Sequence, residues 1–120
     1  MDTNELLLNL VLRLEPTLTG SGMNSGQNYK IDTIPLNEFI LCMEWLQQQR
    51  IGEKINNIRT SYSMKHHCED WTRNVKGQFK YISNGAMVAA IIALGIKYQK
   101  FAESMNVNAA VYVLEVDDDE

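Results

Sequence analysis

The densest group of reactive side chains in this sequence lies in the segment SMKHHCEDW, residues 63–71. On a helix, His66 and Asp70 lie four residues apart on one face, as a metal-binding or acid–base pair does. A helical zinc site needs at least three converging ligands, and the chain has only 2 histidines. We therefore predict a surface contact between these two side chains, and no bound metal or other cofactor.

Cys68 stands next to the two histidines, and a cysteine–histidine pair suggests nucleophilic catalysis. Side chains that are adjacent on a helix do not face one another, however, so this pair is not expected to meet. The other cysteine, Cys42, has no spacing typical of a metal site, and both thiols are predicted to be reduced and buried. No glycine-rich phosphate-binding loop follows a strand. The sequence thus predicts no catalytic residues and a protein that is not an enzyme.

Charge is unevenly distributed along the 120 residues, although the formal net charge is only -4. Residues 1–49 hold six acidic and two basic side chains, residues 50–100 three acidic and nine basic ones, and residues 101–120 six acidic ones. A basic segment of this kind suits a polyanion as partner. It is equally compatible with neutralisation by the acidic tail, within a chain or between subunits, and both interpretations stay open.

Apolar residues at helical spacing predict four helices, over residues 2–14, 36–50, 62–75 and 84–94. The stretch NGAMVAAIIAL carries no charge, which predicts that the last helix lies in the centre of the core, with Gly95 ending it. After it, the segments IKYQKF and AAVYVLEV are rich in aromatic and β-branched residues and predict two short strands. The segment EKINNIR is predicted to be a turn or a short helix.

We therefore predict a mainly α fold of about four helices with a short C-terminal β-hairpin, in a single domain. Residues 1–16 are expected to form an N-terminal helical arm, 17–33 a flexible loop, 34–116 the core and 117–120 an acidic tail. Leucines fill most of the arm, so it must be covered either by its own domain or by a second subunit in a homodimer, and both alternatives stay open. The N-terminus lacks the features of a secretory signal, and no apolar run is long enough to span a membrane, which indicates a cytoplasmic location without membrane contact.

Two segments, TSYSMKHHCEDW and YISNGAMVAAIIALGI, fit a pattern S-Y-x-[LM]-K-H-x-x-E followed by Y-[IV]-S-N-G-A-x-x-A-A and a later glycine. In this pattern the chain resembles small uncharacterised proteins of bacteriophages and plasmids. The resemblance covers about residues 59–96 and implies an origin in a mobile element, without assigned catalytic residues. The matching positions are Ser61, Tyr62, Met64, Lys65, His66, Glu69, Tyr81, Ser83, Asn84, Gly85, Ala86, Ala89, Ala90 and Gly95.

This resemblance implies a non-enzymatic phage or mobile-element accessory protein that binds and modulates or inhibits a host protein, such as a nucleic-acid-handling or defence complex. We expect the partner to contact an exposed, charged face of the third helix. On that face, ion pairs at i, i+4 are each expected to stabilise the helix by only about 0.2–0.5 kcal/mol; they join Lys65 to Glu69 and Glu69 to Arg73. The residues of the face are Lys65, His66, Glu69, Asp70 and Arg73.

The alternative is a DNA- or RNA-binding regulator of winged-helix-like type that uses the basic segment 50–80. A two-helix unit followed by a β-hairpin has the order of a winged helix-turn-helix. The second helix of the unit is uncharged, whereas a recognition helix offers polar side chains to base edges. Contacts are therefore expected with phosphates rather than bases. The residues expected to make them are Arg59, Lys65, Arg73, Lys76 and Lys80.

Overall fold

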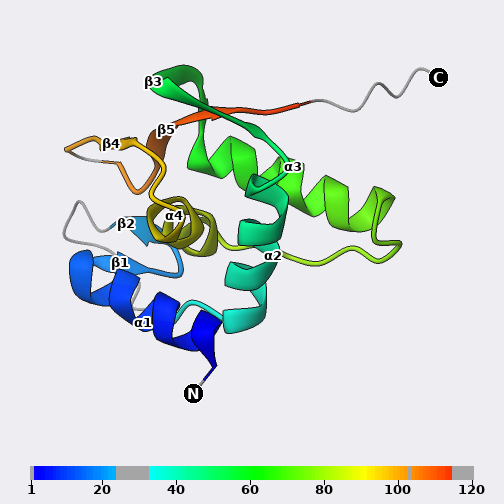
Figure 1. Ribbon diagram of the computed structural model, residues 1–120, viewed down its shortest axis with the longest axis horizontal. Coiled ribbons are helices and arrows are strands. Elements are labelled where there is room, and N and C mark those ends of the chain that lie inside the picture. Colours follow the sequence, from blue (N-terminus) through cyan, green and yellow to red (C-terminus); the bar gives the residue numbers. More distant parts are fainter. Residues whose placement is uncertain (1, 24–32, 103, 115–120) are drawn as a thin grey trace.

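The computed structural model describes residues 2–23, 33–102 and 104–114 of the chain. Within them the fold is mixed α/β, with α1 packed below a central helix and the larger sheet above it (Figure 1). The strands form a two-stranded antiparallel sheet, β1-β2, and a three-stranded antiparallel sheet with the order β3-β5-β4. In chain order the elements are α1 (Thr3–Leu14), β1 (Leu18–Thr19), β2 (Gly22–Met23), α2 (Leu36–Leu46), β3 (Arg50–Thr60), α3 (Ser61–Asn74), α4 (Asn84–Ala93), β4 (Tyr98–Lys100) and β5 (Val107–Tyr112).

The prediction of a mainly α fold was wrong, because the described residues are 46% helix and 23% strand, and the strands form two sheets. The four helices do form close to their predicted positions, although α2 ends at Leu46 and not at residue 50. The predicted C-terminal hairpin exists as β4 and β5, but β5 also pairs with β3 on its other side.

The strand that the sequence analysis missed is β3, for which a turn or a short helix was predicted. Its isoleucines, Ile51, Ile55 and Ile58, are four and three residues apart, which is the spacing of a helix face and not the alternation of a strand. The strand tolerates this spacing because its pairing with β5 shifts register twice, between Ile51 and Asn56 and again between Asn56 and Thr60. Side chains therefore do not alternate regularly between its two faces.

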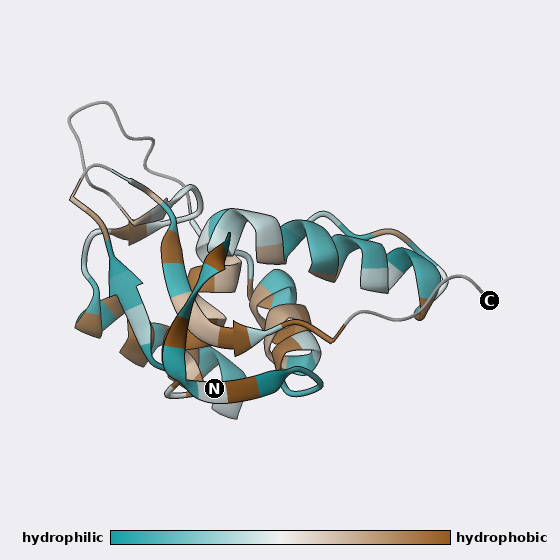
Figure 2. Ribbon diagram, turned by 90° about the horizontal axis from the view of Figure 1, so that it is seen from above, coloured by the Kyte–Doolittle hydropathy of each residue, from teal (hydrophilic) through white to brown (hydrophobic). Residues whose placement is uncertain are grey.

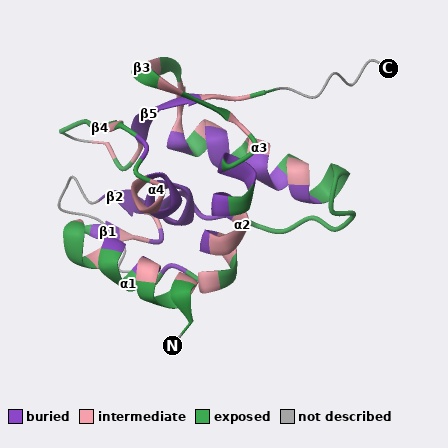
Figure 3. Ribbon diagram, viewed as in Figure 1, coloured by how far each residue is buried: buried purple, intermediate pink, exposed green. Residues whose placement is uncertain are grey.

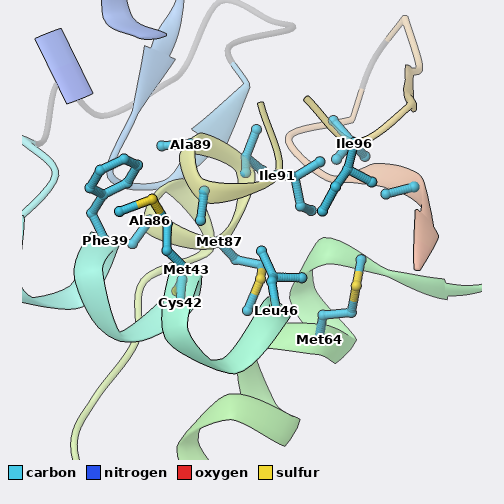
Figure 4. Packing of buried hydrophobic residues seen from close by; sticks show 14 of the residues in the cluster. Phe39, Cys42, Met43, Leu46, Met64, Ala86, Met87, Ala89, Ile91 and Ile96 are labelled. Atoms are coloured by element: carbon cyan, nitrogen blue, oxygen red, sulfur yellow. The ribbon is translucent and has the colours of Figure 1, made fainter. Parts of the chain in front are cut away.

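Helix α4 is the centre of the core, as its lack of charge predicted. The helices α1, α2 and α3 and the β1–β2 hairpin all pack against it, and every residue from Asn84 to Ile91 is buried (Figure 3). Alanines keep α4 narrow, so that large side chains of α2 and α3, such as Phe39 and Met64, can approach it closely (Figure 4). Gly95 follows α4 with φ +71, the left-handed conformation expected after a helix end.

Helix α3 divides into two halves with different surroundings. Its first half packs against α2 and α4, whereas its last turns extend beyond α2, away from the core (Figure 1), and are lined by hydrophilic residues (Figure 2). Thr60 begins the helix, because its hydroxyl accepts a hydrogen bond from the backbone N–H of Ser63. The Ser61 hydroxyl accepts the backbone N–H of Val107, which ties this end of α3 to β5.

The N-terminal segments α1, β1 and β2 pack against α4. Leu8 and Val11 of α1 are buried against it, whereas Leu6, Leu10 and Leu14 are exposed on the outer side of α1. The first part of the predicted loop 17–33 is the β1–β2 hairpin. Residues 24–32 of that loop and the acidic tail 117–120 lie outside the described residues.

Candidate functional site

The pattern that resembles phage and plasmid proteins, here the phage-like pattern, has its first segment in α3 and its second in residues 81–96, which lead into α4 and form it. Backbone N–H groups just before α4 join the two segments by donating hydrogen bonds to side chains of α3. Residues 80–83 belong to no helix or strand, so their N–H groups need other acceptors. Lys80 donates its N–H to the Thr72 hydroxyl at 2.9 Å, and Ile82 donates to Glu69 Oε2 at 3.0 Å. Ser83 donates to Glu38 Oε1 on α2 at 2.8 Å. The chain entering α4 is therefore positioned by polar side chains of both neighbouring helices.

Glu69 is the centre of this network. Besides the Ile82 N–H, its carboxylate accepts a hydrogen bond from Lys65 Nζ at 3.1 Å, and its second oxygen lies 3.1 Å from His66 Nδ1. Burial raises the pKa of Glu69, but the hydrogen bonds from Ile82 and Lys65 and the charge of Lys65 outweigh it, so that the pKa is lowered overall. The carboxylate is thus held in its ionised form.

The sequence Ser83-Asn84-Gly85 attaches the start of α4 to two loops. The Ser83 hydroxyl caps the helix by accepting the N–H of Ala86. The Asn84 amide donates to the backbone oxygens of Ser21 and Met105 and to Asn106 Oδ1, at 3.0–3.1 Å. Gly85 donates its N–H to Gly20 O, and a Cβ at Gly85 would overlap Thr19 O, so only glycine fits here.

A cleft opens beside this network, between the starts of α2, α3 and α4 and the two loops that Asn84 holds. Its volume is about 820 Å³, within the range of ligand sites. Lys65, which is 5% exposed, lies in its wall, and its ammonium is 4.5 Å from the ring centroid of Tyr81 and 5.4 Å from that of Tyr62. Tyr62 and Tyr81 are both more than half exposed. Glu38, Ser83 and Asn84 also line the cleft.

The predicted charged face of α3 is not one exposed surface. The expectation of exposure was wrong for Lys65 and Glu69, which are buried, because α2 and the segment before α4 cover this side of the helix. Only His66, Asp70 and Arg73 reach the surface. Asp70 pairs with Arg73, so neither the predicted contact of His66 with Asp70 nor the ion pair of Glu69 with Arg73 forms.

The predicted nucleic-acid-binding residues are also distributed over different environments. Lys65 is buried, and Arg59 lies 2.6 Å from His67 Nε2. Two others are paired with acidic side chains, Arg73 with Asp70 and Lys76 with Glu44. Helix α4, for which the order of elements predicted the position of a recognition helix, is buried from Asn84 to Ile91 and offers no polar face to a DNA groove.

The two cysteines are free and buried, as predicted. Burial raises the pKa of the Cys42 thiol well above its ordinary value, and the neighbouring Cys68 raises it further. A protonated, inaccessible thiol is a poor nucleophile. In the part of the chain that the structure describes, no three His, Cys, Asp or Glu side chains lie close enough to hold a metal ion.

Five of the cleft residues named above were not predicted as site residues. Four of them were noted only as part of the phage-like pattern, and that pattern was the signal that could have selected them: Tyr62, Tyr81, Ser83 and Asn84. The fifth is Glu38. Glu38 carried no such signal, because a single acidic residue at the start of a helix is a common solvent-facing feature. Its role depends on the approach of Ser83, which is 45 residues away in the sequence.

Compared with descriptions of protein families, with curated proteins and with solved structures, the chain has no significant match. Among residues 2–23, 33–102 and 104–114, no helix combines the length and the apolar character that a membrane span requires. The site must therefore be interpreted from its own geometry.

Proposed function

We propose that the protein is a non-enzymatic binding protein that attaches to a host protein, and that the cleft beside Lys65 is its binding surface. The observation that carries the proposal is the convergence of the phage-like pattern on this cleft. Tyr62 and Lys65 from its first part meet Tyr81, Ser83 and Asn84 from its second part. A rigid, hydrogen-bonded wall with two exposed aromatic rings at its edge is typical of a surface that binds a partner.

The chemistry of the reactive groups supports binding rather than catalysis. The Cys42 thiol is buried with a raised pKa, and Glu69 is committed to three hydrogen-bonding partners. His66 contacts Glu69 and the ring of Tyr62, whose centroid is 4.6 Å from its own. None of these groups is arranged as a nucleophile with a free general base. A mobile-element origin remains part of the proposal through the resemblance alone.

The test uses the exposed rings, because their removal leaves the buried network intact. Immobilised wild-type protein and the variant Tyr62→Ala/Tyr81→Ala are incubated with bacterial lysate, and the captured proteins are quantified by mass spectrometry. We expect the wild type to capture a partner protein, and the variant to capture at least about tenfold less of it. A loss of this size is typical when aromatic contacts at the centre of an interface are removed.

The matched control is Phe79→Ala/Phe101→Ala, which removes two exposed rings that do not line the cleft. It should capture the same partner as the wild type. Equal capture by all three proteins, or loss of the partner from the control alone, would contradict the proposed site.

A nucleic-acid-binding regulator is the second candidate, and one observation favours it. At the outer end of α3, Arg73 lies over the ring of Phe79 and Lys76 over that of Trp71, at 5.0 and 5.2 Å from the centroids. Cations beside aromatic rings are typical of single-strand binding surfaces. Fluorescence anisotropy with labelled DNA and RNA at two salt concentrations tests it. Binding that weakens with salt and is lost in Lys76→Glu/Lys80→Glu would support this candidate.

A further inference from the structure

The hydrogen-bond donors at the base of the cleft are already used within the protein. At the start of α4, the N–H groups of Ser83, Gly85 and Ala86 donate to Glu38, Gly20 and Ser83. The Asn84 amide nitrogen has three acceptors of its own. A helix N-terminus normally attracts anions through such free donors. Here the backbone N–H groups of Ser83, Gly85 and Ala86 are occupied, so the start of α4 is a poor site for a phosphate or a carboxylate.

Lys65, the cation that the described residues contribute to the cleft wall, is also balanced internally. Lys65 Nζ lies 3.1 Å from Glu69 Oε2, and both side chains are at most 8% exposed. The two charges therefore cancel at short range before any ligand arrives. Within the described residues, Glu38 accepts one hydrogen bond, from the neutral N–H group of Ser83, and forms no ion pair, so its negative charge is not balanced there.

Two acceptor atoms of residues that line the cleft have no hydrogen-bond donor among the described residues. One oxygen of Glu38 accepts the Ser83 N–H, and the other receives no hydrogen bond from the described residues. Asn84 is 7% exposed, and its Oδ1 is buried without a hydrogen-bond partner in the described part of the chain. A buried acceptor of this kind is costly unless a donor reaches it. The exposed parts of the rings of Tyr62 and Tyr81 add the negative faces of two π systems.

We propose that the cleft binds a cationic side chain, an arginine or a lysine, presented by the partner protein. The ligand donates to the free oxygen of Glu38, reaches toward Asn84 Oδ1 and packs on the tyrosine rings. Arginine fits better than lysine, because its planar fork can donate to several oxygens while its face stacks on a ring. This inference rests on the proposed function, since it specifies the chemistry of the partner that enters the cleft.

Blocked tripeptides with a central arginine, lysine, citrulline or glutamate serve as probes, with binding followed by NMR through the amides of Tyr62 and Tyr81. We expect affinity in the order arginine, lysine, citrulline, with the glutamate peptide weakest. Citrulline has the shape of arginine without its charge, so it separates charge from size. Binding of the glutamate peptide at least as tight as that of the arginine peptide, or no binding of any peptide, would overturn the inference.

The variant that tests the assigned residue is Glu38→Gln, whose amide oxygen can still accept the Ser83 N–H. It should weaken binding of the arginine peptide by about tenfold, in line with the loss of a charged hydrogen bond. The matched control, Glu44→Gln, makes the same change on α2 at a carboxylate that pairs with Lys76 outside the cleft, and should change the affinity by less than about twofold. Equal affinities for the two variants would rule out Glu38 as the acceptor.

The two proposals can fail separately. If capture of a lysate partner depends on Tyr62 and Tyr81 but is equal for the wild type and Glu38→Gln, the binding site is supported and the cationic ligand is ruled out. If capture does not depend on the two tyrosines, the binding site itself is ruled out.

Discussion

Helix α3 contains two ion pairs of the same length in different surroundings. Lys65 and Glu69 are 3.1 Å apart with side chains 6% and 8% exposed, whereas Arg73 and Asp70 are 3.1 Å apart with side chains 56% and 60% exposed. From the sequence alone, the two pairs cannot be distinguished, because both consist of oppositely charged residues on the same helix. The difference between them arises from what covers the helix, since the first pair lies under the segment that enters α4 and the second extends into solvent.

The comparison shows that distance alone does not determine what an ion pair does for a fold. A solvated pair contributes little, because water screens it and two long side chains must be ordered. A buried pair is costly to form, but removing one partner leaves an uncompensated charge in the interior. Glu69 has a second role, because it also satisfies the backbone N–H of Ile82 and so orients the start of α4. The buried pair therefore supports the cleft, whereas the exposed pair is dispensable.

The largest expected effect is that of Glu69→Ala. The change leaves the Lys65 ammonium and the Ile82 N–H without their acceptor, and we expect the free energy of unfolding to fall by about 3–5 kcal/mol. Urea unfolding followed by circular dichroism measures it. A loss below about 1 kcal/mol would mean that water replaces the carboxylate, and the distinction between the two pairs would not hold.

Glu69 should also make the free energy of unfolding depend on pH in the acidic range. Because the pKa of Glu69 is lowered in the folded state, its contribution is fully present above the unfolded value near 4.5 and is lost as the pH falls through the folded value. Each unit of lowering corresponds to about 1.4 kcal/mol. The measurement is unfolding between pH 7 and pH 3 for the wild type and Glu69→Gln. The variant should be less stable at pH 7 and lose less on acidification; parallel curves would contradict this.

A pair of intermediate burial lies at the other end of the molecule, where Tyr98 of β4 donates its hydroxyl proton to Glu15 after α1, at 2.6 Å. Burial, followed by the hydrogen bond and the charge of Glu15, raises the pKa of Tyr98 to about 12. Stability from this contact is therefore fully present below pH 10 and is lost as the pH rises through about 12. Tyr98→Phe should lose about 1–2 kcal/mol at pH 7. It should also lose less stability than the wild type between pH 10 and 12, as measured by urea unfolding.

The helices were predictable because local signals mark them, such as apolar residues at helical spacing, the uncharged run in α4 and the glycine after it. Strand β3 was not, because bulges that depend on β5 remove the alternation that marks a strand. The cleft was only partly predictable for a related reason. Its residues were visible as a pattern, but Lys65 and Glu69 were interpreted as surface charges. Their burial depends on residues 80–83, which form no helix or strand. No periodic pattern in the sequence therefore predicts that this segment covers α3.

The smallest expected effect is that of Asp70→Asn, which removes the exposed pair while retaining the shape of the side chain. The free energy of unfolding should change by less than about 0.5 kcal/mol, because Arg73 remains hydrated and keeps its contact with the ring of Phe79. The difference from the wild type should shrink further in 1 M salt, where charges are screened within about 3 Å. A loss above about 1 kcal/mol that persists in high salt would show that the outer end of α3 has a structural role. The exposed pair would then resemble the buried one in its effect, and the contrast between the two halves of α3 would be removed.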